Sequence, residues 1–234
     1  MNLTLGALGV LPAIDWLAVI LLFAAWVVYA RFAKVRAATH PSLLDATNRV
    51  RRQWMHRTTL RENRVFDGVV VQNLSSSPSF FASTTILIIG GLLAILGTSD
   101  KASEFVREIP FAARTSTLVF DVKVGVLTAM FIYAFFRFTW SMRQYSFGAL
   151  LVASAPDAHA PWTEADREAF ADKAGGIMGL AAETFNDGLR AYYMAFAATA
   201  WFFSPWACLA ATAFVVGVLY RREFHSDALS LLND

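Results

Sequence analysis

Hydrophobic residues are gathered in four long runs that are separated by charged and polar segments. The runs cover residues 11–32, 80–97, 122–140 and 189–220. A helix rises 1.5 Å per residue, so about 20 apolar residues cross the roughly 30 Å hydrocarbon core of a bilayer. The first three runs therefore predict one transmembrane helix each.

The fourth run is too long for a single crossing. Its 32 residues would make a helix about 48 Å long. Ser204-Pro205 lies near its middle, and proline removes a backbone donor and clashes with the preceding turn. Trp201 and Trp206 flank this break, as aromatic residues do at a membrane interface. We predict two shorter helices joined by a tight turn; one long kinked helix, which would give four spans, is the alternative.

Charge asymmetry predicts the orientation, since short cytoplasmic loops carry an excess of Lys and Arg. The segment from 31 to 77 has nine basic residues against three acidic ones, whereas 98–120 is nearly balanced. We therefore place the first segment in the cytoplasm and the amino terminus outside. Five spans also bring Arg221-Arg222 inside, which four spans would not.

The predicted fold class is an all-α integral membrane helical bundle of the cell inner membrane. It has five transmembrane helices, with four as the alternative, and a small cytoplasmic helical cap, all in one membrane domain covering 1–234. The expected spans are 11–32, 80–97, 122–140, 189–203 and 206–221, and the cytoplasmic segments are 33–77 and 141–188.

The first cytoplasmic segment predicts a basic amphipathic helix. Ser42 and Asp45 have the spacing of a helix N-cap, and a basic stripe follows. Such a helix can lie on anionic lipid headgroups; the plainer interpretation is that its charges only satisfy the positive-inside rule. The candidate headgroup contacts are Arg49, Arg51, Arg52 and Trp54.

The second cytoplasmic segment has the opposite charge, with four basic and seven acidic residues between 143 and 190. Thr163 and Asp166 predict the start of its helix. We expect the two segments to attract each other and form the cap. Two glycine groups, Gly90-Gly91 with Gly97 and Gly175-Gly176 with Gly179, indicate close helix packing.

Ionisable residues near the spans are candidates for a solute pathway. Lys123 and Arg137 are 14 residues apart, which puts them on nearly the same helix face, and Ser141 and Gln144 extend that face. Asp121 begins the same segment. A cationic stripe inside a bundle would suit an anion; alternatively, both cations snorkel to an interface.

Two further groups of ionisable residues need an explanation. Asp15 lies near the start of the first span, where we expect water to solvate it. A second cluster has helical spacings of three and four, so it could guard the inner mouth of the fourth span or form a local ion pair at the surface. Its members are Glu183, Asn186, Asp187 and Arg190.

Composition excludes several classes of protein. The chain is 56% hydrophobic and 16% charged, against about 45–50% and 25% in soluble domains. A net charge of +2 gives no basis for nucleic-acid binding. The single cysteine, Cys208, and four scattered histidines provide no metal site. Hydrolase, P-loop and zinc-protease motifs are absent from the sequence, so we expect neither an enzyme nor a cofactor.

Several short motifs together resemble a known family. They include Arg51-Arg52-Gln53-Trp54-Met55, Asn63-Arg64, Gln72-Asn73, Phe81-Ala82-Ser83-Thr84, Asp121-Val122-Lys123, Phe135-Phe136-Arg137-Phe138-Thr139-Trp140, Arg143-Gln144-Tyr145, Gly188-Leu189-Arg190-Ala191-Tyr192-Tyr193 and Arg222-Glu223-Phe224. In these the chain is similar to an uncharacterised family of multi-pass membrane proteins of bacteria and plants, the five-ninety-nine domain of unknown function. The resemblance covers most of the chain and implies an integral membrane protein, with no activity to carry over.

Two functions fit these observations. The first is an oligomeric channel or small anion transporter, in which Lys123 and Arg137 attract the solute. The second is a non-transporting accessory or assembly factor that binds another membrane protein. Cations that face a water-filled passage would favour the channel, and cations in close ion pairs would favour the accessory factor.

Overall fold

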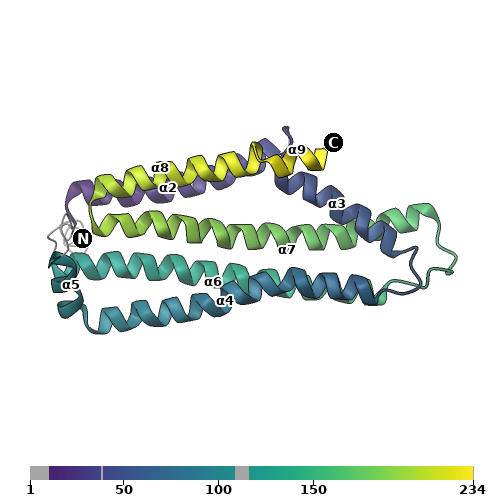
Figure 1. Cartoon of the computed structure of the whole chain (residues 1–234), viewed down its shortest axis with the longest axis horizontal. Coiled ribbons are helices and arrows are strands. Elements are labelled where there is room, and N and C mark those ends of the chain that lie inside the picture. Colours follow the sequence, from purple (N-terminus) through teal and green to yellow (C-terminus); the bar gives the residue numbers. More distant parts are fainter. Residues whose placement is uncertain (1–10, 38, 109–115, 234) are drawn as a thin grey trace, which may run out of the picture. The chain divides into compact units, whose positions relative to one another are not determined.

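The computed structural model describes residues 11–37, 39–108 and 116–233, and these residues form helices and no strand (Figure 1). This confirms the predicted all-α fold class. The longer helices are α2 (Ala13–Ala37), α4 (Val65–Gly97), α6 (Thr117–Ser154), α7 (Glu164–Thr199) and α8 (Pro205–Phe224). The shorter ones are α3 (Leu43–Thr58), α5 (Ser99–Glu108), the 3-10 turn η1 (Ala200–Phe202) and α9 (Asp227–Asn233).

Three of these helices, α2, α4 and α6, are long and apolar enough to cross a membrane. α4 and α6 contain the second and third hydrophobic runs of the sequence, and α2 contains the first from residue 13 onward. α7 and α8 do not reach the same hydropathy, because α7 begins with an acidic half and α8 ends in Arg221 and Arg222.

The long helices extend well beyond the hydrophobic runs. α4 begins at Val65 rather than near residue 80, and α6 continues to Ser154 rather than ending near 140. The extensions are held by packing, since Val71 and Val152 are buried within one hydrophobic core. Hydropathy marks the part of a helix that suits lipid, whereas the helix itself ends where the backbone or the packing ends it.

Contacts divide the chain into two compact units. Unit 1 consists of Met1–Lys34, Thr85–Ala134 and Leu189–Tyr220, and unit 2 of Val35–Thr84, Phe135–Gly188 and Arg221–Asp234. Unit 1 holds the larger part of the predicted spans, and unit 2 holds the larger part of the two predicted cytoplasmic segments.

In unit 1 the chain reverses between α7 and α8, and the two helices lie side by side (Figure 1). After η1 the helix does not continue, and Pro205 begins α8. The Ser204 hydroxyl oxygen accepts a hydrogen bond from the Ala207 amide at 3.0 Å, which caps the new helix. Ser204-Pro205 is therefore a turn between two helices, and one long kinked helix does not form.

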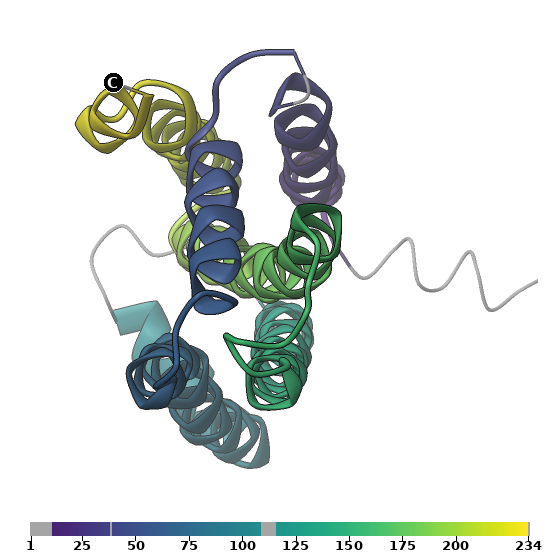
Figure 2. The same cartoon turned by 90° about the vertical axis from the view of Figure 1, so that its right-hand side faces the viewer.

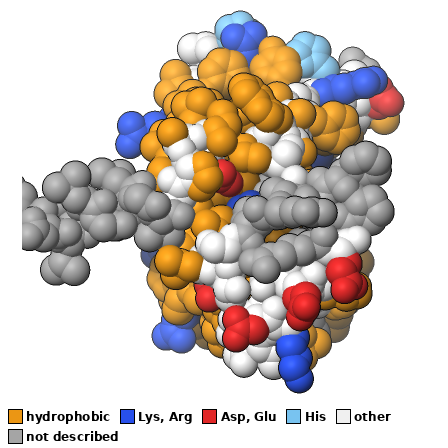
Figure 3. Space-filling model, turned by 90° about the vertical axis from the view of Figure 1, so that its left-hand side faces the viewer, with side chains coloured by type: hydrophobic (Ala, Val, Ile, Leu, Met, Phe, Trp, Pro, Cys, Tyr) orange, Lys and Arg blue, Asp and Glu red, His pale blue; other side chains and the backbone are white. Residues whose placement is uncertain are grey.

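The segment between the second and third runs contains a helix that hydropathy does not reveal. α5 is amphipathic, and its Ser103 is buried with its hydroxyl 3.4 Å from the Thr117 hydroxyl at the start of α6. Figure 3 shows the corresponding end of unit 1, where acidic side chains gather on the lower part of a largely hydrophobic face. The acidic residues of α5 are Asp100, Glu104 and Glu108.

In unit 2, α3 lies obliquely against α7 (Figures 1 and 2). Ser42 caps α3 by accepting from the Asp45 amide at 3.1 Å, and Thr163 caps α7 by accepting from the Asp166 amide at 3.2 Å. Both predicted helix starts are confirmed. The two hydrogen bonds from Thr163 also hold the pKa of the Asp166 carboxyl below its ordinary value.

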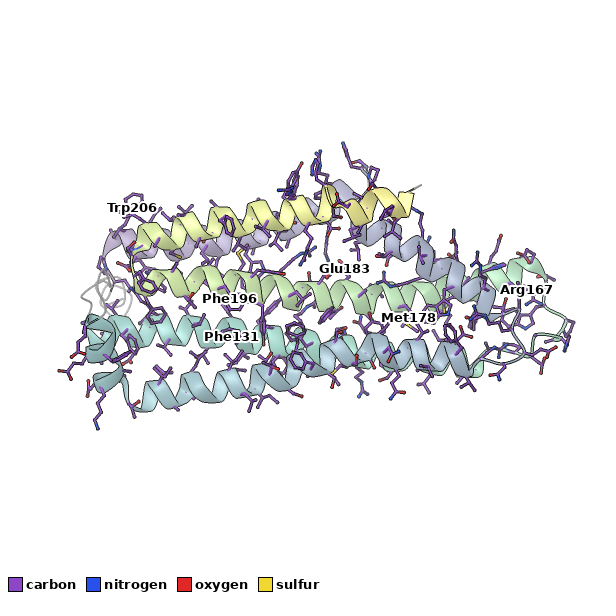
Figure 4. All side chains as sticks on the ribbon, in the orientation of Figure 1. Phe131, Arg167, Met178, Glu183, Phe196 and Trp206 are labelled. Carbon is purple, nitrogen blue, oxygen red and sulfur yellow. The ribbon has the colours of Figure 1, made fainter. Side chains whose placement is uncertain are left out.

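Glycines let α7 pack closely against its neighbours in unit 2. A Cβ on Gly175 would lie 3.0 Å from the Cα of Arg52, and one on Gly179 would lie 2.9 Å from the Asn48 side chain. Met178 points from α7 toward Gly148 of α6 (Figure 4) and would meet a Cβ there. The predicted close packing is confirmed for Gly175 and Gly179, but Gly176 has nothing within 4 Å of a Cβ.

Candidate functional site

A buried cluster of charged and aromatic side chains lies in unit 1. The Lys123 ammonium is 3.7 Å from Asp15 Oδ1, and the two side chains are 1% and 7% exposed. The Trp201 indole N–H donates to the same Oδ1 at 2.6 Å, and Lys123 Nζ donates to the Trp201 carbonyl at 2.8 Å. Asp15, Lys123 and Trp201 therefore join α2, α6 and η1.

Helix ends explain why these charges are tolerated there. Asp15 lies in the first turn of α2, where the partial positive charge of the helix favours a carboxylate. The Trp201 carbonyl belongs to η1, directly after α7, and lacks an intrahelical donor there, so the Lys123 ammonium satisfies it. The ammonium also lies 5.1 Å from the Trp201 ring centroid.

Two sequence expectations about this cluster were wrong. Asp15 is buried rather than solvated, and Lys123 is 2% exposed and does not extend to an interface. Trp201 is likewise buried. The reason is tertiary, because each group has its partner on another helix, and no partner is near it in sequence.

The other candidate cation, Arg137, belongs to unit 2. Its guanidinium forms an ion pair with Asp187 of α7. Ser141 is fully buried and donates to the Ala181 carbonyl at 2.7 Å, while Gln144 is 8% exposed and its Oε1 accepts from no described residue. Lys123 and Arg137 thus each face a carboxylate. Asp121 is half-buried in unit 1, and the described residues offer its Oδ1 no hydrogen-bond donor.

The expected inner-mouth cluster is divided between the units, with Glu183, Asn186 and Asp187 in unit 2 and Arg190 in unit 1. Asp187 contacts α6 through Arg137. Arg190 is 4% exposed, and its guanidinium lies 6.0 Å from the Tyr29 ring centroid. Arg190 is therefore not at the surface, where the sequence led us to expect it, because its long side chain packs inside the unit.

The predicted headgroup contacts of α3 all have partners within unit 2. Arg49 pairs with Asp45, Arg52 lies 3.5 Å from Asp172, and Arg51 donates to the Thr47 hydroxyl and the Asn48 amide oxygen. The Trp54 indole donates to Asp67 at 2.7 Å. Burial lowers the pKa of the Arg51 guanidinium from its ordinary value. The Arg49 and Arg52 side chains remain half-exposed or more.

Sequence reasoning missed two buried polar contacts. Asp67 is 0% exposed, and its Oδ1 accepts from Trp54, Thr58 and Arg61, which ties the end of α3 to the start of α4. In unit 1 the hydroxyls of Thr85 and Tyr192 are 2.6 Å apart. An acidic residue in the first turn of an otherwise apolar helix was the one available signal, and it marked Asp67 no more strongly than any exposed acid.

Three helices that are long and apolar enough to cross a bilayer, with charges buried and paired inside the chain, indicate a helical membrane protein. The chain belongs to the family described as "Protein of unknown function, DUF599", which matches residues 17–228. This confirms the family resemblance of the sequence. No curated protein and no solved structure matches the chain.

Proposed function

We propose that this protein is a non-conducting accessory or assembly factor of the inner membrane, which acts by binding another membrane protein. The ion pairs of Lys123 with Asp15 and of Arg137 with Asp187 support this function over a channel. A cationic stripe attracts anions only while its charge is available, and a carboxylate in contact cancels most of that charge.

The proposal includes the five-span threading with the amino terminus outside. The reversal at Ser204-Pro205 supports it, because the second half of α7 and α8 together form a hairpin of apolar helices. The nine basic residues between 31 and 77 support the cytoplasmic placement of this part of the chain.

The proposed contact surface is the glycine face of α4. Only 11% of the most apolar window of α4 is buried within the chain, against 50% for α6. A Cβ on Gly90, Gly91 or Gly97 would have nothing within 4 Å, so no helix of the described chain approaches this face. The close packing that these glycines predict is therefore not made by the described part of the chain.

On a surface that faces lipid, small residues have no packing advantage over large ones, because lipid tails pack against both equally well. Small residues do let a neighbouring helix approach closely. The glycines of α4 therefore favour a helix of another protein, or of a second copy, as its neighbour. A second copy would make the protein a homo-oligomer.

An anion-flux assay tests the non-conducting part of the proposal. Purified protein in liposomes should give the same leak as empty liposomes, and so should the double variant K123Q/R137Q. Flux through the wild-type protein that the double variant lowers, at equal reconstituted amounts, would refute the accessory function and favour the channel.

Site-directed photocrosslinking tests the contact surface in native membranes. A photoreactive residue at Leu87, which is 76% exposed on α4, should give an adduct of defined mass that the substitutions G90I/G91I abolish. The same residue at Phe214, 72% exposed on α8, is the control and should give none. An adduct of twice the chain mass would identify a second copy; equal adducts at both sites would contradict the proposal.

A further inference from the structure

A groove lies in unit 2 between α3, α6 and α7. Its volume is about 840 Å³, within the range of sites that hold small molecules. Its walls are mainly apolar and are formed by Phe147, Leu150, Leu151, Ile177 and Leu180. Three of these side chains are 38–66% exposed, namely Phe147, Leu150 and Leu180.

One glycine of the groove lining has an open Cβ position. Gly175 and Gly179 face α3 closely, which holds α3 and α7 together. Gly176 lines the groove, and nothing lies within 4 Å of its Cβ position. A side chain at this position would therefore point into space that the rest of the chain leaves open.

The polar groups of the groove are separated by charge. Arg52 and Lys173 line one end, and Glu183 lies ten residues along α7 from Lys173, a distance of about 15 Å on a helix. The contact of Arg52 with Asp172, at 3.5 Å between side chains that are 60% and 71% exposed, is a loose surface pair. One end is therefore basic, and apolar walls lead away from it.

We infer that this groove binds an anionic phospholipid, with its headgroup at Arg52 and Lys173 and one acyl chain along the apolar walls past Gly176. Charge complementarity favours an anionic headgroup over a zwitterionic one, and the walls match an acyl chain. The inference rests on the membrane location in the proposed function, and it names a lipid that the protein would select.

Native mass spectrometry tests this site on the full chain in an uncharged detergent. Phosphatidylglycerol and phosphatidylcholine with the same acyl chains are added in separate titrations. The wild-type protein should retain one phosphatidylglycerol under conditions that remove phosphatidylcholine. R52Q and K173Q should each weaken its retention about fivefold, as expected for one basic residue near an anionic headgroup.

The substitution G176L separates the groove from general lipid binding. It places a side chain at an open position of the groove lining and replaces a poor helix former with a good one, so the variant should fold and lose the retained phosphatidylglycerol. G68L is the matched control, because Gly68 of α4 is also helical, lies in the same unit and has an open Cβ position outside the groove. The control should retain the lipid.

Three results would overturn the inference. The first is equal retention of phosphatidylglycerol by G176L and G68L. The second is equal retention of phosphatidylglycerol and phosphatidylcholine by the wild type. The third is a wild-type protein that retains oleate but not phosphatidylglycerol. None of them bears on the proposed function, which fails instead if the protein conducts anions or purifies without detergent.

Discussion

The buried charges of this protein are stabilised as pairs. Removing one partner of a buried pair leaves the other charged and desolvated, which costs about 3–5 kcal/mol, whereas removing both is often nearly neutral. Asp15 with Lys123 in unit 1 and Asp67 with Arg61 in unit 2 both have a carboxylate that is less than a tenth exposed. For each pair, a single substitution should therefore lower the free energy of unfolding much more than the double substitution does.

The first prediction concerns Lys123. K123M should lower the free energy of unfolding by about 3–5 kcal/mol, which for a chain of this size lowers the melting midpoint by about 10 °C. The double variant D15N/K123M should recover most of that loss, because no buried charge remains. The melting midpoints of both variants are measured by heating the protein in detergent and following its aggregation by size-exclusion chromatography. A K123M protein as heat-resistant as the wild type would contradict the buried pair.

The second prediction contrasts a buried with an exposed carboxylate in unit 2. D67A removes the acceptor of three donors and should cost about 3 kcal/mol or more. D172A removes only the exposed partner of Arg52 and should cost less than about 1 kcal/mol. Denaturant unfolding followed by tryptophan fluorescence gives both values, and similar values for the two variants would argue against the role of Asp67 in joining α3 to α4.

Individual helices are positioned by small residues at their points of contact. A Cβ on Gly188 of α7 would lie 2.4–2.9 Å from ring atoms of Phe138 on α6, whereas one on Gly176 of the same helix meets nothing. Both residues have the same helix propensity, so their different surroundings decide the effect of a methyl group.

The third prediction compares these two glycines. G188A should destabilise the protein by about 1–3 kcal/mol, because the Phe138 ring must move. G176A should stabilise it by up to about 1 kcal/mol through helix propensity alone. Melting midpoints of the two variants, measured side by side in one detergent, should move in opposite directions; a shift in the same direction would mean that the α6–α7 contact at Gly188 is looser than described.

For the whole molecule, the proposed threading depends on whether the α7–α8 hairpin crosses the membrane. With the amino terminus outside, a three-span threading and a five-span threading both place the carboxyl terminus inside. The two threadings differ in the location of the turn after η1, which lies outside only if the α7–α8 hairpin crosses the membrane. Trp206, next to this turn and 67% exposed (Figure 4), is therefore the informative position.

The fourth prediction uses thiol labelling in intact cells with a reagent that does not cross membranes. In a C208A background, W206C should react from outside, whereas A228C in α9 should react only after the cells are opened. The native Cys208 is 1% exposed and is removed so that only the introduced thiol reports. Protection of both positions until the cells are opened would reduce the count to three spans.

Features that depend on neighbouring residues could be predicted from the sequence. Ser42 and Thr163 cap helices with a residue three positions away, and Pro205 ends one helix and begins another through its own ring. Apolar length likewise indicates which helices suit a bilayer, because it is a property of one continuous segment.

The candidate site could be predicted only in part, because its partners lie far apart in the chain. Helical periodicity placed Lys123 and Arg137 on one face but did not indicate that Asp15 and Asp187 would neutralise them. The signal for Asp67, an acid in the first turn of an apolar helix, was too weak to mark it, since its donors come from α3 and from the segment that follows α3.

The sequence by itself therefore determined the helical class, the helix caps, the break at Ser204-Pro205 and the family. Only the tertiary structure decided which charges are buried, which glycines meet a neighbour and where a groove remains. The physical reason is that caps, breaks and hydropathy act within a few residues, whereas ion pairing and packing depend on the distance between side chains that only folding brings together.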